Sequence, residues 1–261
     1  MNESQVFSVR EGLRVFVSAG AAGIGRAITD AFLEQGARVW VCDVSEEALS
    51  EFNRAHPDSP ATHADVGRFE DLERLFGDIR RDWGGLDVLV NNAGVAGPTA
   101  GVDEIDPDEW RRTVDINLNG QFYCAKLAVP MLKESRGVMI NISSVAGRLG
   151  YAFRTPYAAT KWAIVGLTQS LAKELGPSGV RVNAILPGIV RGPRIERVIG
   201  ARADALGVPY EEMENEYRQK ISLRRMVEPT DVANMAVFLC CPAGANVSGQ
   251  ALSVCGNVET L

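Results

Sequence analysis

Tyr157 and Lys161 are the residues whose types and spacing most directly indicate chemistry. They lie four residues apart in a segment of strong helix formers, and side chains at that spacing share one face of a helix. An ammonium group beside a phenol favours the phenolate and lowers the pKa of the tyrosine from its ordinary value of about 10. The pair therefore predicts a proton donor and acceptor that works near neutral pH.

A second signal is the turn of small residues from Ser18 to Gly25, which follows the first apolar run and opens a helical pattern. Such a turn lets the backbone approach a pyrophosphate, which then lies at the N-terminus of the helix. Close packing of a helix against a strand would explain the same residues. The turn indicates a dinucleotide site, whose predicted contacts are Ser18, Gly20, Gly23 and Ile24.

Asp43 ends the second strand-like run, 18 residues after Gly25. A carboxylate there can accept hydrogen bonds from both adenosine ribose hydroxyls and would repel a 2′-phosphate. No arginine or lysine immediately follows Asp43, and Ala22 rather than a basic residue precedes Gly23. These residues predict NAD as the cofactor, and an aspartate that only caps the next helix is the alternative interpretation.

The elements that must position these groups alternate along the chain. Strands are expected at 13–18, 38–42, 86–90, 138–142, 180–186 and 251–254, with another that ends near residue 65 and one long helix over 106–133. This alternation predicts the α/β class, with a doubly wound, Rossmann-like parallel sheet of about seven strands and helices on both faces. Residues 1–261 are expected to form a single dinucleotide-binding domain, with a substrate-lid insertion at about 193–225.

Composition narrows the partners and the compartment. The net charge of -6, without a run of basic residues, argues against nucleic acid or a membrane as a partner. His56 and His63 have no metal-ligand partner at useful spacing, so no metal site is predicted. Five cysteines without paired spacing favour reduced thiols in the cytoplasm. No signal peptide and no membrane span are expected, because the N-terminal segment and the apolar runs lack their patterns.

The order of several motifs resembles the short-chain dehydrogenase/reductase family over roughly residues 12–256. The turn from Ser18 to Gly25 is similar to the family's Thr-Gly-x-x-x-Gly-Ile-Gly. The other matching motifs are Asp65-Val66, Asn91-Asn92-Ala93-Gly94, Asn117 in the long helix, Ser144-x12-Tyr157-x3-Lys161, Pro187-Gly188 and Ser248-Gly249-Gln250. Their occurrence in this order is far more specific than any one of them.

The resemblance implies four catalytic residues. Tyr157 would exchange a proton with the substrate oxygen, and Lys161 would lower the pKa of Tyr157 and bind the nicotinamide ribose. Ser144 would hold the substrate oxygen, and Asn117 would position a water that links Lys161 to solvent. A serine that only caps a turn and an asparagine that only fixes its helix are the alternatives. The implied cofactor contacts also include Asp65, Val66, Asn92, Gly94, Tyr157, Lys161 and Val190.

Three positions depart from the family pattern. Ala19 stands where the family has its first glycine, Gly192 stands where it often has a threonine, and Cys255 begins a segment that replaces Asp-Gly-Gly. Gly20 is expected to let the turn form despite Ala19. Backbone groups near Val190 are expected to replace the threonine's contact with the cofactor carboxamide.

The implied activity is an NAD(H)-dependent oxidoreductase that interconverts a secondary alcohol and a ketone. The predicted substrate contacts are Arg148, Phe153, Arg154, Arg191 and Arg194. The arginines suggest an anionic substrate, a carboxylate or a sulfonate, and a sugar or polyol is a further candidate. The alternative is that these arginines form a solvated helix face paired with Glu196 or with the acidic residues at 211–216.

Rival functions stay open at this point. The first is an NADPH-dependent 3-ketoacyl or carbonyl reductase of the same fold, and the second is an epimerase or dehydratase with a bound cofactor. A rival from another class is a non-catalytic cofactor-binding or scaffold protein. An intact set of Ser144, Tyr157, Lys161 and Asn117 argues against a non-catalytic role.

The helix of Tyr157 and the long helix that begins near Asp108 are apolar nearly all round. A helix of this kind is buried on more than one side. One face can cover the sheet and another can pair with a second subunit, so a homodimer or homotetramer is expected.

Overall fold

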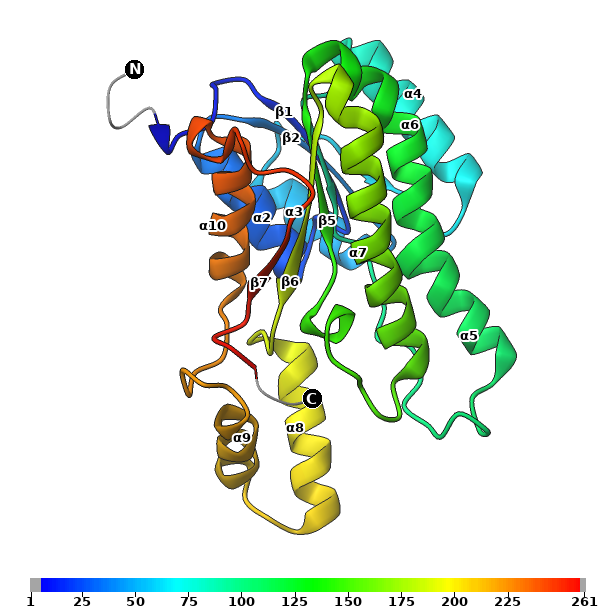
Figure 1. Cartoon of the computed structure of the whole chain (residues 1–261), viewed down its shortest axis with the longest axis vertical. Coiled ribbons are helices and arrows are strands. Elements are labelled where there is room, and N and C mark those ends of the chain that lie inside the picture. The colour runs from blue at the N-terminus through cyan, green and yellow to red at the C-terminus, as the bar shows by residue number, and fades with distance from the viewer. Residues whose placement is uncertain (1–5, 259–261) are drawn as a thin grey trace.

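A seven-stranded parallel sheet forms the centre of the computed structural model, which describes residues 6–258 apart from the side chains of 201, 202 and 205 (Figure 1). The strands are β1 (Arg14–Ser18), β2 (Arg38–Asp43), β3 (Ala61–His63), β4 (Val88–Asn91), β5 (Val138–Ile142), β6 (Arg181–Pro187) and β7 (Ala251–Val254). Their order is β3-β2-β1-β4-β5-β6-β7, which reverses direction between β1 and β4. This doubly wound order confirms the predicted fold class.

Helices cover both faces of the sheet. They are α2 (Gly23–Glu34), α3 (Glu46–Ala55), α4 (Phe69–Trp83), α5 (Pro107–Val114), α6 (Gly120–Ser135), α7 (Thr155–Leu175), α8 (Pro193–Leu206), α9 (Tyr210–Gln219) and α10 (Pro229–Cys240). Helices α2, α3 and α10 pack on one face, and α4, α6 and α7 pack on the other (Figure 1). No helix of the described residues is long and apolar enough to cross a membrane.

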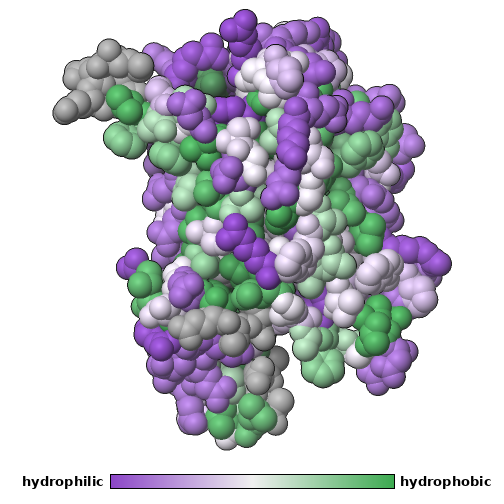
Figure 2. All heavy atoms as spheres, in the orientation of Figure 1, coloured by the Kyte–Doolittle hydropathy of each residue, from purple (hydrophilic) through white to green (hydrophobic). Residues whose placement is uncertain are grey.

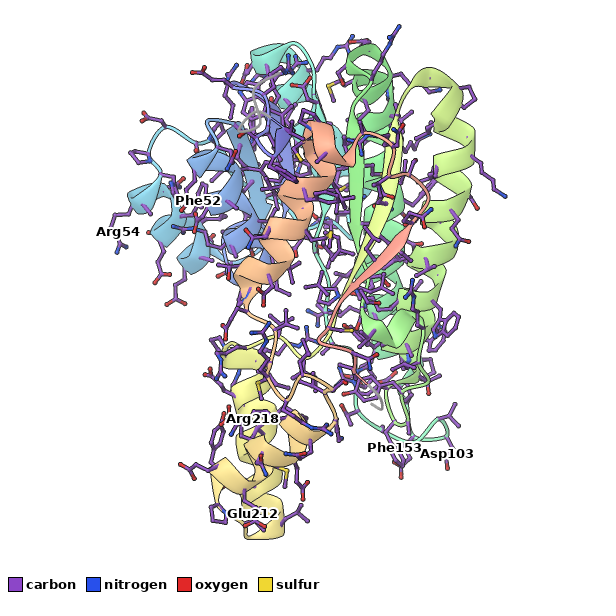
Figure 3. All side chains as sticks on the ribbon, turned by 60° about the vertical axis from the view of Figure 1, so that its left-hand side comes forward. Phe52, Arg54, Asp103, Phe153, Glu212 and Arg218 are labelled. Carbon is purple, nitrogen blue, oxygen red and sulfur yellow. The ribbon has the colours of Figure 1, made fainter. Side chains whose placement is uncertain are left out.

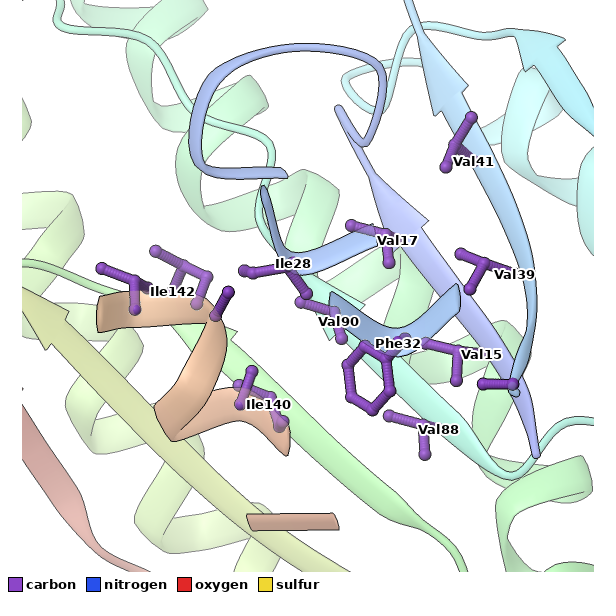
Figure 4. Close-up of a cluster of buried hydrophobic side chains, with 14 of the residues drawn as sticks. Val15, Val17, Ile28, Phe32, Val39, Val41, Val88, Val90, Ile140 and Ile142 are labelled. Carbon is purple, nitrogen blue, oxygen red and sulfur yellow. The ribbon is translucent and has the colours of Figure 1, made fainter. Parts of the chain in front are cut away.

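Alternation along the strands divides the core into two layers. Val15 and Val17 of β1 point toward α2, where they meet Ile28 and Phe32 (Figure 4). Phe16, between them, points to the opposite face, so the strand is apolar at each of its three central positions. The carboxyl ends of all seven strands therefore reach one edge of a sheet that is held rigidly from both sides.

The long helix expected over 106–133 is present as continuous helical backbone over 107–135, but it contains a π-helical turn that was not expected. Asp106 caps α5 by accepting a hydrogen bond from the amide of Asp108 at 2.8 Å. A π-helical turn, Asp115–Asn119, then separates α5 from α6. A π turn carries an extra residue and re-aims the side chains within it. Asn117 lies inside this turn, where its side chain is fully buried.

Helices α8 and α9 form the insertion at 193–225 and project beyond the carboxyl edge of the sheet (Figure 1). Their small core includes Ile199, Met213 and Ile221. The lid, a name we use for residues 193–225, is joined to the segment after β7. Ile221 forms an antiparallel bridge with Val258, and the amide of Ser222 donates to the carbonyl of residue 257 at 2.9 Å. The outer side of α9 is hydrophilic (Figure 2).

Candidate active site

Tyr157 and Lys161 lie side by side on α7, as their spacing predicts. Nζ of Lys161 is 5.6 Å from the centroid of the Tyr157 ring, and it donates a hydrogen bond to the carbonyl oxygen of Ile142 at 3.0 Å. The lysine is 4% exposed. Burial first, and the positive charge of Arg194 second, lower the pKa of Lys161 to about 7. A bound anion or a phenolate at this position would therefore favour the charged lysine.

Ser143 and Ser144 follow β5 and have different partners. Oγ of Ser143 donates to the carbonyl oxygen of Lys161 at 2.7 Å, which ties the end of β5 to α7. Oγ of Ser144 accepts a hydrogen bond from the amide of Ala146 at 3.1 Å. Ser144 thus caps the turn after β5, and its hydroxyl hydrogen has no acceptor among the described residues. Capping and substrate binding are compatible because they use opposite sides of the same hydroxyl group.

Asn117 has the structural contacts that the alternative interpretation requires. Its Oδ1 accepts from the amide of Val95 at 2.7 Å, and its Nδ2 donates to the carbonyl of Val95 at 3.0 Å and to Oγ1 of Thr160 at 3.1 Å. These bonds hold the loop after β4 against α7. The role in water positioning stays a prediction, because the side chain is fully used in joining these segments.

Gln121 is a contributor that sequence reasoning missed. Its Nε2 donates to the carbonyl oxygen of Ile142 at 3.2 Å, the same oxygen that accepts from Lys161. The residue is buried, and its Oε1 has no hydrogen-bond partner among the described residues. The one sequence signal for it is a polar side chain four residues after Asn117 in a largely apolar stretch.

The predicted cofactor turn is built into the point where the strand order reverses. Oγ of Ser18 accepts from the amides of Asn92 and Ala93, each at 3.0 Å. Nδ2 of Asn92 donates to the carbonyls of Ser18 at 3.1 Å and Ala19 at 3.0 Å. Ala19 has a φ of 49°, in the left-handed region that favours glycine. The bonds from Asn92 hold this strained backbone, so the turn forms without the family's glycine.

The N-terminus of α2 is open toward this turn. Ala22 caps it without a side-chain hydrogen bond, and no acidic residue stands in the first turn, which contains Gly23 and Ile24. Gly23 has a φ of 56°, and a Cβ placed on it would meet no atom within 4 Å. A Cβ on Gly20 would lie 2.6 Å from Val41, so the chain passes close to β2 there. Unsatisfied amides and the helix dipole at such an end fit a pyrophosphate.

Asp43 stands at the carboxyl end of β2 and is half-buried. Its Oδ1 accepts from the amide of Ser45 at 3.1 Å, while its Oδ2 has no partner among the described residues. Ser45 is the residue that caps α3, because its Oγ accepts from the amide of Ala48 at 3.2 Å. Helix capping is therefore supplied by Ser45, and Asp43 keeps an oxygen available for a ribose hydroxyl.

The remaining predicted cofactor contacts line the same edge. Asp65 and Val66 follow β3, and the Val66 side chain is buried, which leaves its backbone for a ligand. Gly94 follows β4, and a Cβ placed on it would lie 3.4 Å from Nζ of Lys161. Val190 follows β6 and is half-buried. Together with the open helix end and Asp43, these positions fit a nicotinamide dinucleotide with its nicotinamide half near Lys161.

The four arginines among the five predicted substrate contacts separate into two near Tyr157 and two that bind other residues. Cζ of Arg154 and Cζ of Arg194 lie 5.4 and 5.8 Å from the centroid of the Tyr157 ring. Arg191 instead pairs with carboxylates, and Arg148 donates to Oγ of Ser253 at 3.2 Å on β7.

Phe153 lies on an exposed loop with a φ of 62°. Figure 3 shows it near Asp103, at the same end of the molecule as the labelled lid residues Glu212 and Arg218. Phe153 would therefore contact only a substrate that extends toward this end of the molecule.

Comparison with known proteins agrees with this geometry. A family model described as enoyl-(acyl carrier protein) reductase matches residues 19–257. L-fucose dehydrogenase of Bos taurus is 37% identical over 248 residues, 95% of this chain and 90% of that protein. Trans-4-hydroxycyclohexanecarboxylate dehydrogenase of Sinomonas cyclohexanicum is 34% identical over 253 residues, 92% of this chain and 90% of that protein.

A solved structure shows the same fold. A variant of the actinorhodin polyketide ketoreductase, crystallised with NADPH, has a TM-score of 0.89 and 32% sequence identity, with 96% of this chain and 98% of that chain covered. The similarities span nearly the whole length of each protein. On its sequence, its sheet order and the arrangement around Tyr157, the chain belongs to the short-chain dehydrogenase/reductase family of oxidoreductases.

Proposed function

We propose that the protein is an NAD(H)-dependent oxidoreductase that interconverts a secondary alcohol and a ketone. The observation that carries this proposal is the buried Lys161 beside Tyr157, at the edge of the sheet where the cofactor turn and Gly94 also lie. The nicotinamide, when bound, supplies or accepts the hydride. Tyr157 gives a proton to the ketone oxygen or takes one from the alcohol, and Ser144 donates a hydrogen bond to that oxygen.

The choice of NAD(H) rests on Asp43. Its unpartnered Oδ2 is suited to accept from a ribose hydroxyl, and a 2′-phosphate at the same place would meet a negative charge. An NADPH-dependent ketoacyl or carbonyl reductase is the second candidate, because a ketoreductase of the same fold was crystallised with NADPH. The ratio of kcat/KM with NAD+ to that with NADP+ separates the two candidates.

Two substrate classes have support from relatives. One relative is named for L-fucose, a sugar, and another for a hydroxycyclohexanecarboxylate, an acid. A panel of secondary alcohols with NAD+, followed by NADH absorbance, tests the activity and ranks the classes. The panel would include L-fucose, xylitol, trans-4-hydroxycyclohexanecarboxylate and its neutral methyl ester.

The general acid and base is tested by Tyr157→Phe. Loss of the phenolic hydroxyl is expected to lower kcat/KM by about 10²- to 10⁴-fold, the usual contribution of a positioned proton donor. Binding of NADH should be retained, because the ring remains on α7. Substantial turnover by this variant would contradict the proposed role of Tyr157.

We also propose a homodimer or homotetramer that forms through the outer surfaces of α5, α6 and α7. Trp110, Phe122 and Trp162 are 38%, 49% and 52% exposed on these three helices, and a cluster of exposed aromatic residues is typical of a protein interface. Light scattering would give the mass of the oligomer, and Trp162→Asp should lower that mass by weakening the interface.

We also propose a cytoplasmic location, since all five cysteines are unpaired.

A further inference from the structure

Three cationic side chains surround the ring of Tyr157. Nζ of Lys161 and the Cζ atoms of Arg154 and Arg194 all lie 5.4–5.8 Å from its centroid. Neither arginine forms an ion pair with a carboxylate of the described residues. The positive charge of Arg194 disfavours the charged form of Lys161, and an oxidised nicotinamide would add a further positive charge. A bound anion at this site would offset the positive charge of these side chains.

Arg154 is held in place but only partly used. Its Nη2 donates to the carbonyl oxygen of Ala96 at 2.8 Å, and its guanidinium also lies over the ring of Tyr151 at 5.4 Å. These contacts fix the plane of the group between the loop after β4 and the start of α7. Its Nε is buried and has no hydrogen-bond partner among the described residues. A buried donor without a partner costs free energy, which a bound acceptor would recover.

Arg194 approaches the same ring from the lid. It stands in the first turn of α8, and no hydrogen bond or ion pair joins it to a residue that the structure describes. Its charge reaches the site, because Arg194 contributes to the lowered pKa of Lys161. The guanidinium is therefore available to a ligand that lies between the lid and α7.

Arg191, two residues before the lid, shows how a neighbouring arginine without a ligand role is arranged. Its Nε donates to Glu228 at 2.9 Å, and its Nη1 lies 3.5 Å from Glu214. The ion-paired alternative considered for all the arginines thus holds for Arg191, whereas Arg154 and Arg194 form no ion pair with a described residue. Arg191 and Arg194 are three residues apart, so they form a matched pair for mutagenesis.

We propose that Arg154 and Arg194 form a two-sided clamp for a singly charged oxyanion, a carboxylate or a sulfonate, carried by the substrate a few bonds from its reacting carbon. Guanidinium groups bind such oxyanions through paired, charge-assisted hydrogen bonds. The clamp places the anionic group over the Tyr157 ring while the alcohol or ketone oxygen lies at Ser144 and the phenol. This assignment rests on the proposed oxidoreductase function and names the substrate class within it.

Calorimetric binding tests the clamp without turnover. Cyclohexanecarboxylate, cyclohexanesulfonate and the neutral cyclohexanecarboxamide are titrated into the NADH-saturated protein. The acid or the sulfonate should bind at least tenfold more tightly than the amide, as expected for hydrogen bonds to charged groups. The stronger of the two anions identifies the oxyanion. Equal affinity for all three ligands, or no binding of either anion, would overturn the clamp.

Substitutions assign the effect to residues. Arg154→Met and Arg194→Met should each weaken binding of the anion about tenfold or more and leave the amide unchanged, whereas Arg191→Met should change neither. Arg194→Glu lies at an exposed position and should abolish anion binding. This variant provides the test if Arg154→Met does not fold. An anion affinity that survives Arg194→Glu sinks the proposal.

The alcohol panel keeps this test separate from the proposed function. A protein that binds cyclohexanecarboxylate through Arg154 and Arg194 but oxidises no alcohol with NAD+ or NADP+ would retain the clamp and contradict the oxidoreductase proposal. A protein that oxidises neutral and acidic alcohols equally well, with no effect of either arginine, would retain the activity and contradict the clamp.

Discussion

Lys161 and Gln121 donate hydrogen bonds to the same carbonyl oxygen, that of Ile142 at the end of β5, at 3.0 and 3.2 Å. Two donors from different helices therefore converge on the last residue of a central strand. The shared oxygen fixes Nζ of Lys161 relative to α6 as well as to its own helix. We therefore expect Gln121 to act as a positioning residue for Lys161, through the carbonyl oxygen of Ile142 that both side chains bind.

Replacing Gln121 by Met should lower kcat several-fold and change KM for the substrate little, because the lysine loses a constraint but the pocket keeps its shape. Loss of one buried hydrogen bond should also lower the free energy of unfolding by about 1 kcal/mol. Steady-state kinetics and urea unfolding measure the two effects.

Gln121→Glu distinguishes positioning from a purely structural role. A carboxylate this close to Lys161 should raise the pKa of the lysine. The acid limb of the plot of kcat against pH should then move to higher pH. An unchanged pH profile in this variant would mean that Gln121 only supports packing.

Stability should depend on pH through Lys161. Its pKa is about 7 in the folded protein against an ordinary value of 10.5, so the unfolded chain binds more protons between these values. The free energy of unfolding should therefore rise from pH 7 toward pH 10.5, by at most about 5 kcal/mol at 1.4 kcal/mol per pKa unit. Below pH 7 the full cost of burying the charged lysine is present.

Lys161→Met removes this titration, and the difference between wild type and variant in urea unfolding isolates it from other groups. The groups that face Lys161 are Tyr157 on its own helix and Arg194 from the lid. Arg194→Met should raise the pKa of the lysine and start the rise at higher pH. Identical slopes for wild type and Lys161→Met would refute the assignment.

Asp43 should control the choice of cofactor. Asp43→Ala is expected to lower kcat/KM for NAD+ about tenfold or more, through loss of hydrogen bonds to a carboxylate, and to raise it for NADP+. Glu46→Ala, in the first turn of α3, removes the same charge from a nearby helix end and serves as the control. A cofactor preference that moves equally in both variants would point to general charge rather than to ribose recognition.

Ala19 provides a stability prediction. Its φ of 49° costs an L-residue roughly 1–2 kcal/mol, whereas glycine adopts it freely but loses about 0.5–1 kcal/mol more backbone entropy on folding. Ala19→Gly should thus stabilise the protein by up to about 1.5 kcal/mol, the difference between these two terms. Ala22→Gly, at an extended φ of -141°, has no strain to release and should be destabilising. Chemical denaturation gives the free energy of unfolding of both variants, and equal changes in the two would contradict the strain assigned to Ala19.

The sheet and the proximity of Tyr157 and Lys161 were predictable because both depend on local patterns. Strand ends carry Ser18, Asp43 and Ser144, and parallel strands bring those ends to one edge whatever the helices do. The π turn around Asn117 was not predictable, since Asp115 to Asn119 reads as ordinary helix and the extra residue is stabilised by tertiary contacts. The expected long helix is therefore confirmed in extent, and the π turn within it was missed.

The arginines divide between ligand and surface through tertiary contacts as well. Arg191 is neutralised by Glu214 and Glu228, which are 23 and 37 residues away in the chain. No local pattern around Arg191 or Arg194 separates them, because both stand in the same short arginine-rich stretch. Which of them keeps an unpaired charge depends on where the tertiary structure places Glu214 of α9 and Glu228 at the start of α10.

The joint between the lid and the segment that follows β7 affects how the protein can be handled. The amide of Leu223 donates to the carbonyl of Gly256 at 3.1 Å, next to the bridge between Ile221 and Val258. A fusion or affinity tag attached beyond residue 258 would therefore stand close to the end of the lid. Kinetic work is best done with an N-terminal tag, because that end of the described chain leaves the sheet at its opposite edge (Figure 1).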